Sequence, residues 1–507
     1  MCSIAGVINK KEVIGGMIKM LEHRSPDEEG FFTDRNFEMG MGRLKIIDLK
    51  SEDLCPYREA NFVLAYNGEL YNYIELREEL EKKGWQFRTT SDTEVLMKCW
   101  RQWGFKMFDK LNAMFAFAIY DSQKNQLVLA RDIAGEKPLY YYKKNHVFAF
   151  ASEAKVFTKN FTLTYQSNRF FEAFQHCFLK TLWNEVGELP PASYLVYDLK
   201  KNSYFIKPYW EFKKRHINLK TAQEELESLM DDAVKIRTRS DVPYGLYYSG
   251  GIDSALISTF HTFANKFYFD KSKQSKGDFF RHIEKVTYHL DFPVGSFSSY
   301  PLWKLAQRAS KKVKVVISGE GADEIFGGYV RYLPIAREHE LRLQYSSYND
   351  YLFSKYFQFP AYLDGFTRLT ARNDDYEYVR SVLEPFFKMF DDPINAMGFA
   401  DFKLVLPSLF QMGDRMAGSF GIENRCPFLD RRIIEFGFSL PWDFKIKGLE
   451  QKVILRKILS KKGLTAPLLK QKEGLTIPAN RWLAKKNDWD RSYYFNFVKN
   501  KWSQLYL

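Results

Sequence analysis

The chain begins with the stretch Cys2-Ser3-Ile4-Ala5-Gly6-Val7 after a single methionine, so an apolar run follows directly on a cysteine. This run predicts a short buried strand that starts at Cys2. Removal of Met1 would leave Cys2 with both a thiol and a free α-amine, whose ordinary pKa is about 7.7–8.0. An amine of this kind can take the proton of a neighbouring nucleophile in acyl transfer. We therefore predict that Cys2 is a nucleophile held at the start of a strand.

Polar motifs follow Cys2 in a fixed order. They are His23-Arg24-Ser25-Pro26-Asp27, Gly42-Arg43-Leu44-Lys45-Ile46-Ile47-Asp48, Tyr66-Asn67-Gly68-Glu69-Leu70-Tyr71-Asn72 and Ser91-Asp92-Thr93-Glu94. With Cys2, they make the chain resemble the class II glutamine amidotransferases, whose N-terminal cysteine hydrolyses glutamine to glutamate and ammonia. The resemblance implies an αββα sandwich of the Ntn-hydrolase type at the N-terminal end.

The resemblance also implies a role for each matching residue. Cys2 would form the thioester, and Asn67 with the backbone N–H of Gly68 would form the oxyanion hole, where one donor typically contributes about 10²–10³ in rate. Glutamine would be bound by Arg43, through a two-point contact with its carboxylate, by Asp92, through its ammonium group, and by Asn67 and Glu69.

Ser25 departs from the family pattern, which has glycine at this position. If the backbone there needs a positive φ, serine is strained where glycine is not, and we expect weakened rather than abolished glutaminase activity.

A second motif is Ser249-Gly250-Gly251-Ile252-Asp253-Ser254, which follows the apolar stretch Pro243-Tyr244-Gly245-Leu246-Tyr247-Tyr248. The order predicts a strand, a glycine turn and a helix that begins near Ser254. Backbone N–H groups in such a turn, together with the helix N-terminus, bind anions. No Gly-Lys-Ser/Thr follows, which excludes a Walker A loop. The motif resembles the pyrophosphate-binding loop of the ATP pyrophosphatases.

Another predicted strand, at residues 313–317, ends in a turn with the sequence Ser318-Gly319-Glu320-Gly321-Ala322-Asp323-Glu324. Carboxylates clustered beside a triphosphate are typical of Mg²⁺ binding, because Mg²⁺ takes one or two carboxylates together with phosphate oxygens. We therefore predict a Mg²⁺ site at Asp253 and Asp323.

These motifs together resemble the glutamine-hydrolysing asparagine synthetase family over nearly the whole chain. Further matching segments are Arg131-Asp132, residues 135–141, residues 151–155, residues 421–430 and Lys472-Glu473-Gly474-Leu475-Thr476-Ile477-Pro478. The resemblance implies that a carboxylate, aspartate by this match, attacks the α-phosphorus of ATP to give an acyl-adenylate and pyrophosphate. Ammonia from the first site, carried through a dry passage, then displaces AMP.

In the synthetase half, the resemblance assigns ATP binding to Tyr248, Ser249, Gly250, Gly251, Asp253, Ser254, Phe269, Ser318 and Gly319. It assigns Glu320 to formation of the adenylate and Lys472 to stabilisation of the leaving pyrophosphate. The implied cofactors are ATP and Mg²⁺, and the family suggests a homodimer.

The segment between the two nucleotide motifs is short. Ser318 follows Ser249 by 69 positions, whereas the family has on the order of forty more. Residues 267–270 predict the second strand, and the polar segment 271–278 leads directly to the next helix, so one helix and one strand are expected to be missing. In the strand order 3-2-1-4-5 of this fold, the missing strand lies at the edge. We expect its loss to expose one side of the adenine pocket.

The length of 507 residues predicts two to three domains. We place a glutaminase domain at residues 2–205 and a doubly wound ATP-pyrophosphatase domain at residues 221–507. Amphipathic stretches at residues 433–438 and 453–459 predict a largely helical C-terminal part. The five cysteines form no Cys-x-x-Cys motif, which excludes a zinc site or disulfide framework of the usual spacing. Without a long apolar stretch or a signal peptide before Cys2, we expect a cytoplasmic protein.

Three rival hypotheses remain open. The net charge of +13 would suit a nucleic-acid-binding enzyme, although the lysines are scattered and no aromatic–basic RNA motif is present; we expect neither nucleic acid nor a membrane as partner. A second rival changes the acceptor to another carboxylate, such as a sugar acid in surface-polysaccharide biosynthesis. The third is a glutaminase with a degenerate synthetase half.

Overall fold

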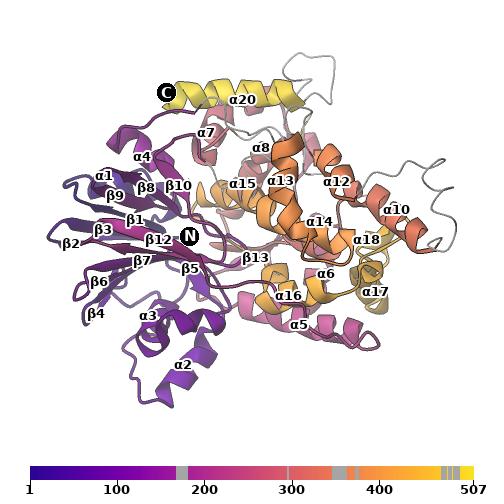
Figure 1. Cartoon of the computed structure of the whole chain (residues 1–507), viewed down its shortest axis with the longest axis horizontal. Helices are drawn as coiled ribbons and strands as arrows, with labels where there is room; N and C mark the ends of the chain where they lie inside the picture. The colour runs from indigo at the N-terminus through magenta and orange to yellow at the C-terminus, as the bar shows by residue number, and fades with distance from the viewer. Residues whose placement is uncertain are drawn as a thin grey trace.

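The computed structural model describes residues 1–166, 181–293, 296–344, 362–370, 376–469, 475, 477, 482 and 491–506. A strand-rich N-terminal part lies beside a mainly helical C-terminal part (Figure 1). The N-terminal helices are α1 (Ile14–Lys19), α2 (Tyr73–Glu81), α3 (Asp92–Trp103) and α4 (Lys155–Asn160), with 3₁₀ turns at Glu22–Arg24 and Gly104–Asp109.

Two antiparallel sheets form the N-terminal part. The first has the order β10-β8-β9-β1-β3-β2 and the second the order β12-β11-β7-β6-β5-β4. Their strands are β1 (Ser3–Ile8), β2 (Glu28–Asp34), β3 (Phe37–Arg43), β4 (Tyr57–Glu59), β5 (Phe62–Leu70), β6 (Ala113–Asp121), β7 (Gln126–Arg131), β8 (Tyr140–Lys144), β9 (Val147–Ala151), β10 (Val186–Glu188), β11 (Ser193–Asp198) and β12 (Ser203–Pro208).

The sheets pack face to face around a core that includes Ile4, Val63, Ala116 and Phe148. Helices α2 and α3 cover the outer face of the second sheet through a separate apolar cluster, while α1 packs against β1 and β3 of the first sheet. These layers are the αββα sandwich that the sequence predicts.

Strand β1 lies inside its sheet, between β3 and β9, and every one of its residues is buried. Ser3 pairs with Gly42, and Ala5 pairs with Ala151. Burial on both faces explains why the sequence from Ser3 onward is continuously apolar rather than alternating. The strand therefore fixes Cys2 at its N-terminal end, as predicted.

The C-terminal part contains a parallel sheet of four strands with the order β14-β13-β15-β16 among the described residues. The strands are β13 (Tyr244–Tyr247), β14 (Lys266–Phe267), β15 (Val315–Ile317) and β16 (Glu423–Arg425). The order matches 2-1-4-5 of the doubly wound fold, and in the part of the chain that the structure describes no strand lies beyond β14. The prediction that the edge strand is missing is confirmed, and loss at the edge leaves the central pairing of β13 with β15 intact.

Helices cover both faces of this sheet. The first helix after β13, α6, begins two residues before Ser254, which agrees with the predicted strand, turn and helix. The helices are α5 (Ala222–Arg237), α6 (Ile252–Phe260), α7 (Lys276–Leu290), α8 (Ser299–Ala309), α9 (Ala322–Phe326), α10 (Leu333–Gln344), α12 (Tyr362–Thr370), α13 (Tyr376–Phe387), α14 (Pro393–Leu404), α15 (Leu406–Gly418), α16 (Arg431–Ser439), α17 (Val453–Lys461), α18 (Ala466–Leu469) and α20 (Arg491–Tyr506). Short 3₁₀ turns lie at Lys271–Lys273, Val330–Tyr332, Pro427–Leu429 and Trp442–Phe444, and β17 (Ile446–Lys447) pairs with β18 (Glu450–Gln451).

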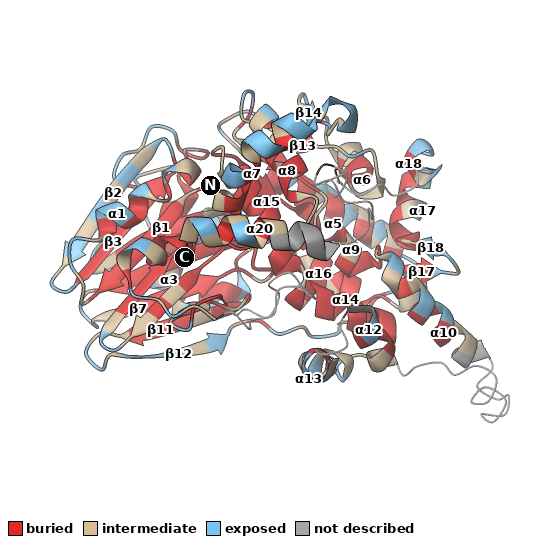
Figure 2. Cartoon of the chain, turned by 90° about the horizontal axis from the view of Figure 1, so that it is seen from above, coloured by how far each residue is buried: buried red, intermediate tan, exposed pale blue. Residues whose placement is uncertain are grey.

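Helix α15 lies at the centre of the molecule and is buried along almost all of its length (Figure 2). One side of it carries Met412 and Met416, which join the core that contains β1, α7 and α8. Another side carries Asp414 and Arg415, which bind residues of the N-terminal part. The helix therefore holds the two parts together. Within the described residues, no helix has the length and apolarity needed to cross a membrane.

Candidate active sites

Cys2 lies between β1 and the turn at Glu22–Arg24. Its backbone carbonyl accepts a hydrogen bond from Arg24 Nε at 3.4 Å, and the adjacent Ser3 Oγ lies 2.7 Å from Ser25 Oγ. Burial raises the pKa of the Cys2 thiol. The α-amine, which belongs to Met1 in the structure, is also buried, and burial lowers its pKa to about 5. This amine is neutral at pH 7, but it belongs to Met1, and the amine of Cys2 is free only after Met1 is removed.

Ser25 has a φ of −141°, outside the left-handed region that favours glycine. The backbone cost considered for this substitution therefore does not arise. The serine side chain instead bonds to Ser3 next to the nucleophile.

Asn67 and Gly68 lie near the end of β5. The Asn67 side chain is fully buried, and neither Nδ2 nor Oδ1 has a hydrogen-bond partner among the described residues. A Cβ atom added to Gly68 would lie 2.2 Å from the Met114 carbonyl oxygen, so only glycine fits. Leaving a buried amide unpaired costs about 1–3 kcal/mol. The Asn67 amide is therefore available to a ligand.

Arg43 is positioned by the loop that follows β3. Its Nη2 donates to the carbonyls of Ile47, at 3.0 Å, and Asp48, at 2.7 Å, and its Nη1 lies 3.4 Å from Glu28 Oε2. The two carbonyls fix the guanidinium, and the more distant Glu28 carboxylate compensates its charge only in part. That charge acts on the Cys2 thiol, so the structure brings Arg43 and Cys2 together.

Asp92 and Glu69 form the acidic side of the same region. Asp92 begins α3, its Oδ2 accepts the Leu70 N–H at 3.0 Å, and burial raises its pKa to about 6. Glu69 Oε2 binds Arg425 Nη2 at 2.8 Å, while Oε1 has no partner among the described residues. Burial also raises the pKa of Glu69. Glu423 acts electrostatically on both Asp92 and Cys2, so strand β16 of the C-terminal part closes this site.

The predicted phosphate loop connects β13 to α6. Gly250 has a φ of +73°, which glycine adopts without strain. The side chains of the two serines that bound the loop stabilise the turn: Ser249 N donates to Ser254 Oγ at 3.2 Å, and Gly251 N donates to Ser249 Oγ at 3.2 Å. The turn directs the N-terminus of α6 toward the second glycine loop, where a Cβ on Gly319 would lie 2.7 Å from Asp253 Cβ. The two loops are therefore in contact, as the sequence predicts.

Lys452 lies between the two carboxylates predicted to bind metal. Its Nζ is 2.6 Å from Asp253 Oδ1 and 2.7 Å from Asp323 Oδ1. Burial disfavours the charged ammonium, but the two carboxylates outweigh it and raise the pKa of Lys452. No motif singled out Lys452. One signal could have done so: it directly precedes the amphipathic stretch 453–459, and a cation at a helix N-terminus is unfavourable for the helix dipole unless something else holds it.

Glu320 lies at the turn after β15, against α15 and β16. Its Oε2 accepts a hydrogen bond from Asn424 Nδ2 at 3.0 Å and lies 3.7 Å from Cys426 Sγ. Burial raises the pKa of Glu320 to about 7. Ser318 of the same turn lies with its Oγ 3.4 Å from Cys426 Sγ. A carboxyl group with a pKa near neutral pH is suited to proton transfer.

The remaining predicted residues lie in different surroundings. Tyr248 makes an edge contact with Tyr268, with ring centroids 5.3 Å apart, and Lys266 Nζ lies over its ring. Phe269 packs against the core cluster of α7, α8 and α15. Tyr268, which no motif singled out, is the aromatic residue next to Tyr248. Lys472 lies outside the described residues, as does Cys177.

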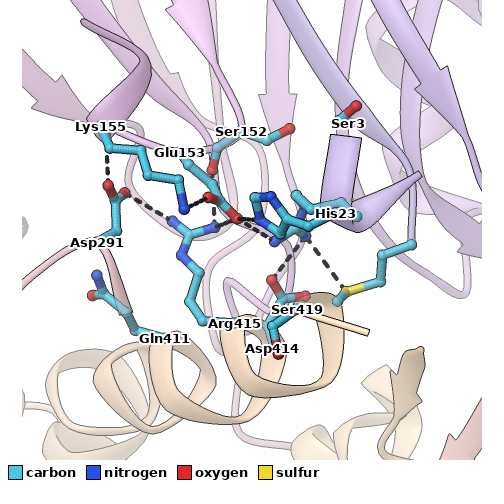
Figure 3. A network of polar contacts seen from close by, with 12 residues as sticks. Ser3, His23, Ser152, Glu153, Lys155, Asp291, Gln411, Asp414, Arg415 and Ser419 are labelled. Carbon is cyan, nitrogen blue, oxygen red and sulfur yellow. Dashed lines mark hydrogen bonds and ion pairs between the residues drawn. The ribbon is translucent and has the colours of Figure 1, made fainter. Parts of the chain in front are cut away.

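A buried network of charges joins the two parts of the chain close to Cys2 (Figure 3). Glu153 lies 2.9 Å from Arg24, 3.1 Å from Arg415, 2.5 Å from Lys155 and 3.3 Å from His23. Arg24 also binds Asp414 of α15 at 2.8 Å. Because Arg24 holds the Cys2 carbonyl, helix α15 is connected to the nucleophile through one side chain.

Comparisons with known proteins agree with this division. Residues 1–210 match the glutamine amidotransferase domain family, and residues 225–268 and 263–493 match the asparagine synthase family. The second match consists of two pieces that meet at the shortened segment. The fold and the two sites thus define a glutamine amidotransferase joined to an ATP-dependent synthase.

Individual relatives identify the family more specifically. Asparagine synthetase [glutamine-hydrolyzing] 1 of Bacillus subtilis is 30% identical over 100% of this chain and 91% of its own length. A putative asparagine synthetase [glutamine-hydrolyzing] 2 of Methanocaldococcus jannaschii is 34% identical over 66% of this chain and 76% of its own length. Asparagine synthetase B of Escherichia coli is 30% identical over 67% of each chain. The chain belongs to the glutamine-hydrolysing asparagine synthetase family, and it is a ligase-type enzyme whose synthetase domain uses ATP.

Proposed function

We propose that the enzyme converts L-aspartate to L-asparagine with nitrogen from glutamine, through an aspartyl-adenylate, and releases AMP, pyrophosphate and glutamate. One observation supports this above the others. Strand β16 carries Arg425, which binds Glu69 of the predicted glutamine site, and Asn424, which binds Glu320 of the predicted adenylation site. Two half-reactions joined by one three-residue strand fit an enzyme that makes ammonia and consumes it.

In the glutaminase half, the thiolate of Cys2 attacks the amide carbon of glutamine. The thiol proton goes to the α-amine and then to the departing ammonia, and water hydrolyses the thioester to glutamate. The Asn67 amide and the N–H of Gly68 hold the oxyanion. Arg43 faces the carboxylate of glutamine, and Asp92 and Glu69 face its ammonium group. This chemistry requires removal of Met1, because the amine must belong to Cys2.

In the synthetase half, the turn from Ser249 to Ser254 binds the phosphates through backbone N–H groups and the N-terminus of α6. Ser318 and Gly319 line the nucleotide site from the second loop, Tyr248 and Phe269 lie on the adenine side, and Lys472 neutralises the pyrophosphate. Glu320 acts at the acyl group during formation of the adenylate.

The residues present fit a divalent cation. Asp253 and Asp323 converge on one point, at which the Lys452 ammonium now lies within 2.7 Å of both. Two carboxylates with phosphate oxygens and waters form a common Mg²⁺ ligand set. Bound there, Mg²⁺ would neutralise charge that develops on the phosphates. With the carboxylates on the metal, the Lys452 ammonium would be available to the phosphate oxygens.

We further propose a glutaminase domain at residues 2–205 and a synthetase domain at residues 221–507. The last strand of the second sheet, β12, continues to Pro208, three residues beyond the first domain as proposed, and α5 begins at Ala222. The family resemblance also supports a homodimer.

A second acceptor is favoured by one observation. The parallel sheet has no strand beyond β14 among the described residues, which leaves room for a larger carboxylate such as a sugar acid. The test is to incubate the enzyme with MgATP and glutamine, add L-aspartate or glucuronate, and measure AMP, pyrophosphate and the amide. Asparagine with stoichiometric AMP supports the proposal. AMP release only with glucuronate would favour the second acceptor, and ADP release would contradict both.

A further inference from the structure

Asn424 occupies the middle of β16, where the two parts of the chain meet. Side chains alternate along a strand. Those on either side of Asn424 bind each other and the glutaminase part, with Arg425 Nε 2.9 Å from Glu423 Oε1 and Arg425 Nη2 2.8 Å from Glu69 Oε2. The Asn424 side chain instead donates from Nδ2 to Glu320 Oε2 at 3.0 Å. The strand thus places one amide group beside the carboxylate of the adenylation site.

The oxygen of the Asn424 amide, Oδ1, lacks a hydrogen-bond donor among the described residues. A carboxylate accepts hydrogen bonds only, so Nδ2 must face Glu320 and Oδ1 must face elsewhere. Asn424 is 6% exposed, and among the described residues Oδ1 has no donor. A buried acceptor without a donor costs about 1–3 kcal/mol. The expected occupant is therefore a small molecule that can donate a hydrogen bond.

Two charged side chains connect the surroundings of Glu320 to the glutaminase part. The charges of Asp414, on α15, and of Lys137, on the turn after β7, both act on Glu320, and these two side chains lie 3.3 Å apart. Asp414 also lines a cavity of about 10 Å³ between the turn at Gly135 and Glu136 and the residues Pro407 and Phe410 of α15; neither Glu320 nor Asn424 belongs to its lining. This is the space that one water-sized molecule needs. Ammonia has the same size.

We propose that Asn424 Oδ1 is the binding group for ammonia in the synthetase half. This inference rests on the proposed function. Ammonia has three N–H donors and one lone pair, so a hydrogen bond to Oδ1 orients the molecule and leaves the lone pair free. The lone pair attacks the carbonyl carbon of the acyl-adenylate and the C–N bond forms. The C–O bond to AMP then breaks, AMP keeps the electron pair, and the surplus proton on nitrogen passes to the Glu320 carboxylate.

The matched pair of variants is Asn424→Ala and Cys426→Ala. Both remove a donor to Glu320 Oε2, but only Asn424→Ala removes the free acceptor. Amide formation is measured at pH 8 with MgATP, L-aspartate and varied ammonium chloride, and adenylate formation is measured as ATP–pyrophosphate exchange without a nitrogen source. We expect the KM for ammonia to rise about threefold to tenfold in Asn424→Ala, the equivalent of one hydrogen bond, and to stay within twofold in Cys426→Ala. Exchange should respond similarly in both variants.

With glutamine as nitrogen source, Asn424→Ala should also release more glutamate per amide formed. Asn424→Val, which also lacks the acceptor oxygen, is the second variant if Asn424→Ala does not fold. An unchanged KM for ammonia in a folded Asn424 variant, or an equal rise in Cys426→Ala, would overturn the inference and show that the orphaned atom binds water only. Absence of both exchange and amide formation in the wild-type enzyme would contradict the proposed function itself, and with it this inference.

Discussion

Lys452 donates hydrogen bonds to both carboxylate oxygens of Asp253, at 2.6 and 2.7 Å, across 199 positions of sequence. Lys452 also has a φ of +55° at the N-terminus of α17, a conformation that costs a side-chain-bearing residue of order 1 kcal/mol or more. A strained cation at a helix N-terminus is retained only where the surroundings compensate it. The two carboxylates supply this compensation and thereby locate the charged centre of the synthetase half.

The first prediction concerns this centre. Asp253→Asn and Asp323→Asn each remove a charge with little change in volume, so folding should persist, while AMP and pyrophosphate formation should fall at least about a hundredfold. Lys452→Met should lower the same rate. It should also destabilise the protein at low Mg²⁺, because two carboxylates are left without their cation. Asp391→Asn, in an exposed ion pair with Lys214, is the control and should leave both quantities unchanged.

The second prediction separates the two half-reactions. Cys2→Ala should abolish glutamate release from glutamine and leave synthesis from ammonium salts, because the sites are distinct. Cys99→Ala, a change at a buried cysteine beneath the second sheet, is the control for a general loss of structure. Mass spectrometry of the active enzyme should show a chain that starts at Cys2. Loss of both activities in Cys2→Ala alone would contradict the division.

The third prediction is a pH dependence. Burial raises the pKa of Glu320 to about 7, so its carboxylate is increasingly protonated below pH 7. If the charged form acts in synthesis, the ammonia-dependent rate, expressed per concentration of neutral ammonia, should fall up to tenfold per pH unit below about 7. The rate of glutamate release should not show this fall below pH 7. In Glu320→Gln, the fall in rate below pH 7 should disappear together with most of the activity. If the fall persists in this variant, another group causes it.

The same group affects stability with a definite sign. The folded state holds the Glu320 proton more tightly than the unfolded state, whose carboxyl group has an ordinary pKa near 4.3. Its contribution to the free energy of unfolding is therefore fully present below about pH 4 and is lost as pH rises to about 7. Glu324, whose pKa burial also raises to about 7, acts in the same direction. The difference in unfolding free energy between wild type and Glu320→Gln, measured in urea at pH 5 and pH 8, should change with that sign.

The fourth prediction concerns the contact between the two parts. Arg425 is fully buried and binds both Glu69 and Glu423. Arg425→Met leaves two buried carboxylates without their cation, which should cost about 3–5 kcal/mol of unfolding free energy. It should also raise the KM for glutamine, because Glu69 is no longer held in place. Arg337→Met, in an exposed ion pair with Glu340, should cost less than 1 kcal/mol.

The fifth prediction addresses nucleotide selectivity. No strand of the described residues lies outside β14, and Tyr268 is exposed, so part of a bound adenine ring should stay in water. At roughly 25 cal/mol per Å², some tens of Å² left exposed reduce binding by about 1–2 kcal/mol, around tenfold in affinity. Calorimetry should show weak MgATP binding with little discrimination against MgGTP, because the phosphate contacts are unaffected. If neither nucleotide binds at millimolar concentration, the result supports the hypothesis of a glutaminase with a degenerate synthetase half.

Local sequence determined much of this protein. Apolar runs predict β1, β13 and β15, because short buried strands need continuous apolar residues. Glycine turns mark the ends of β13 and β15. The pairing of Asp253 with Asp323 could also be predicted, since each follows a parallel strand and the carboxyl ends of neighbouring parallel strands meet at one edge. The missing edge strand followed from the spacing between Ser249 and Ser318, which is shorter than in the family.

The tertiary structure alone decided the contacts on which the proposals depend. Lys452 lies in no motif, and the matching segment 421–430 assigns no role to Asn424 or Arg425. The partners of these three residues lie 199, 104 and 356 positions away. Their importance arises from burial: a charge or amide removed from water must find a partner wherever the packed chain supplies one. A residue sequence specifies which groups can pair, whereas only the packing of α15 and β16 between the two parts determines which of them do.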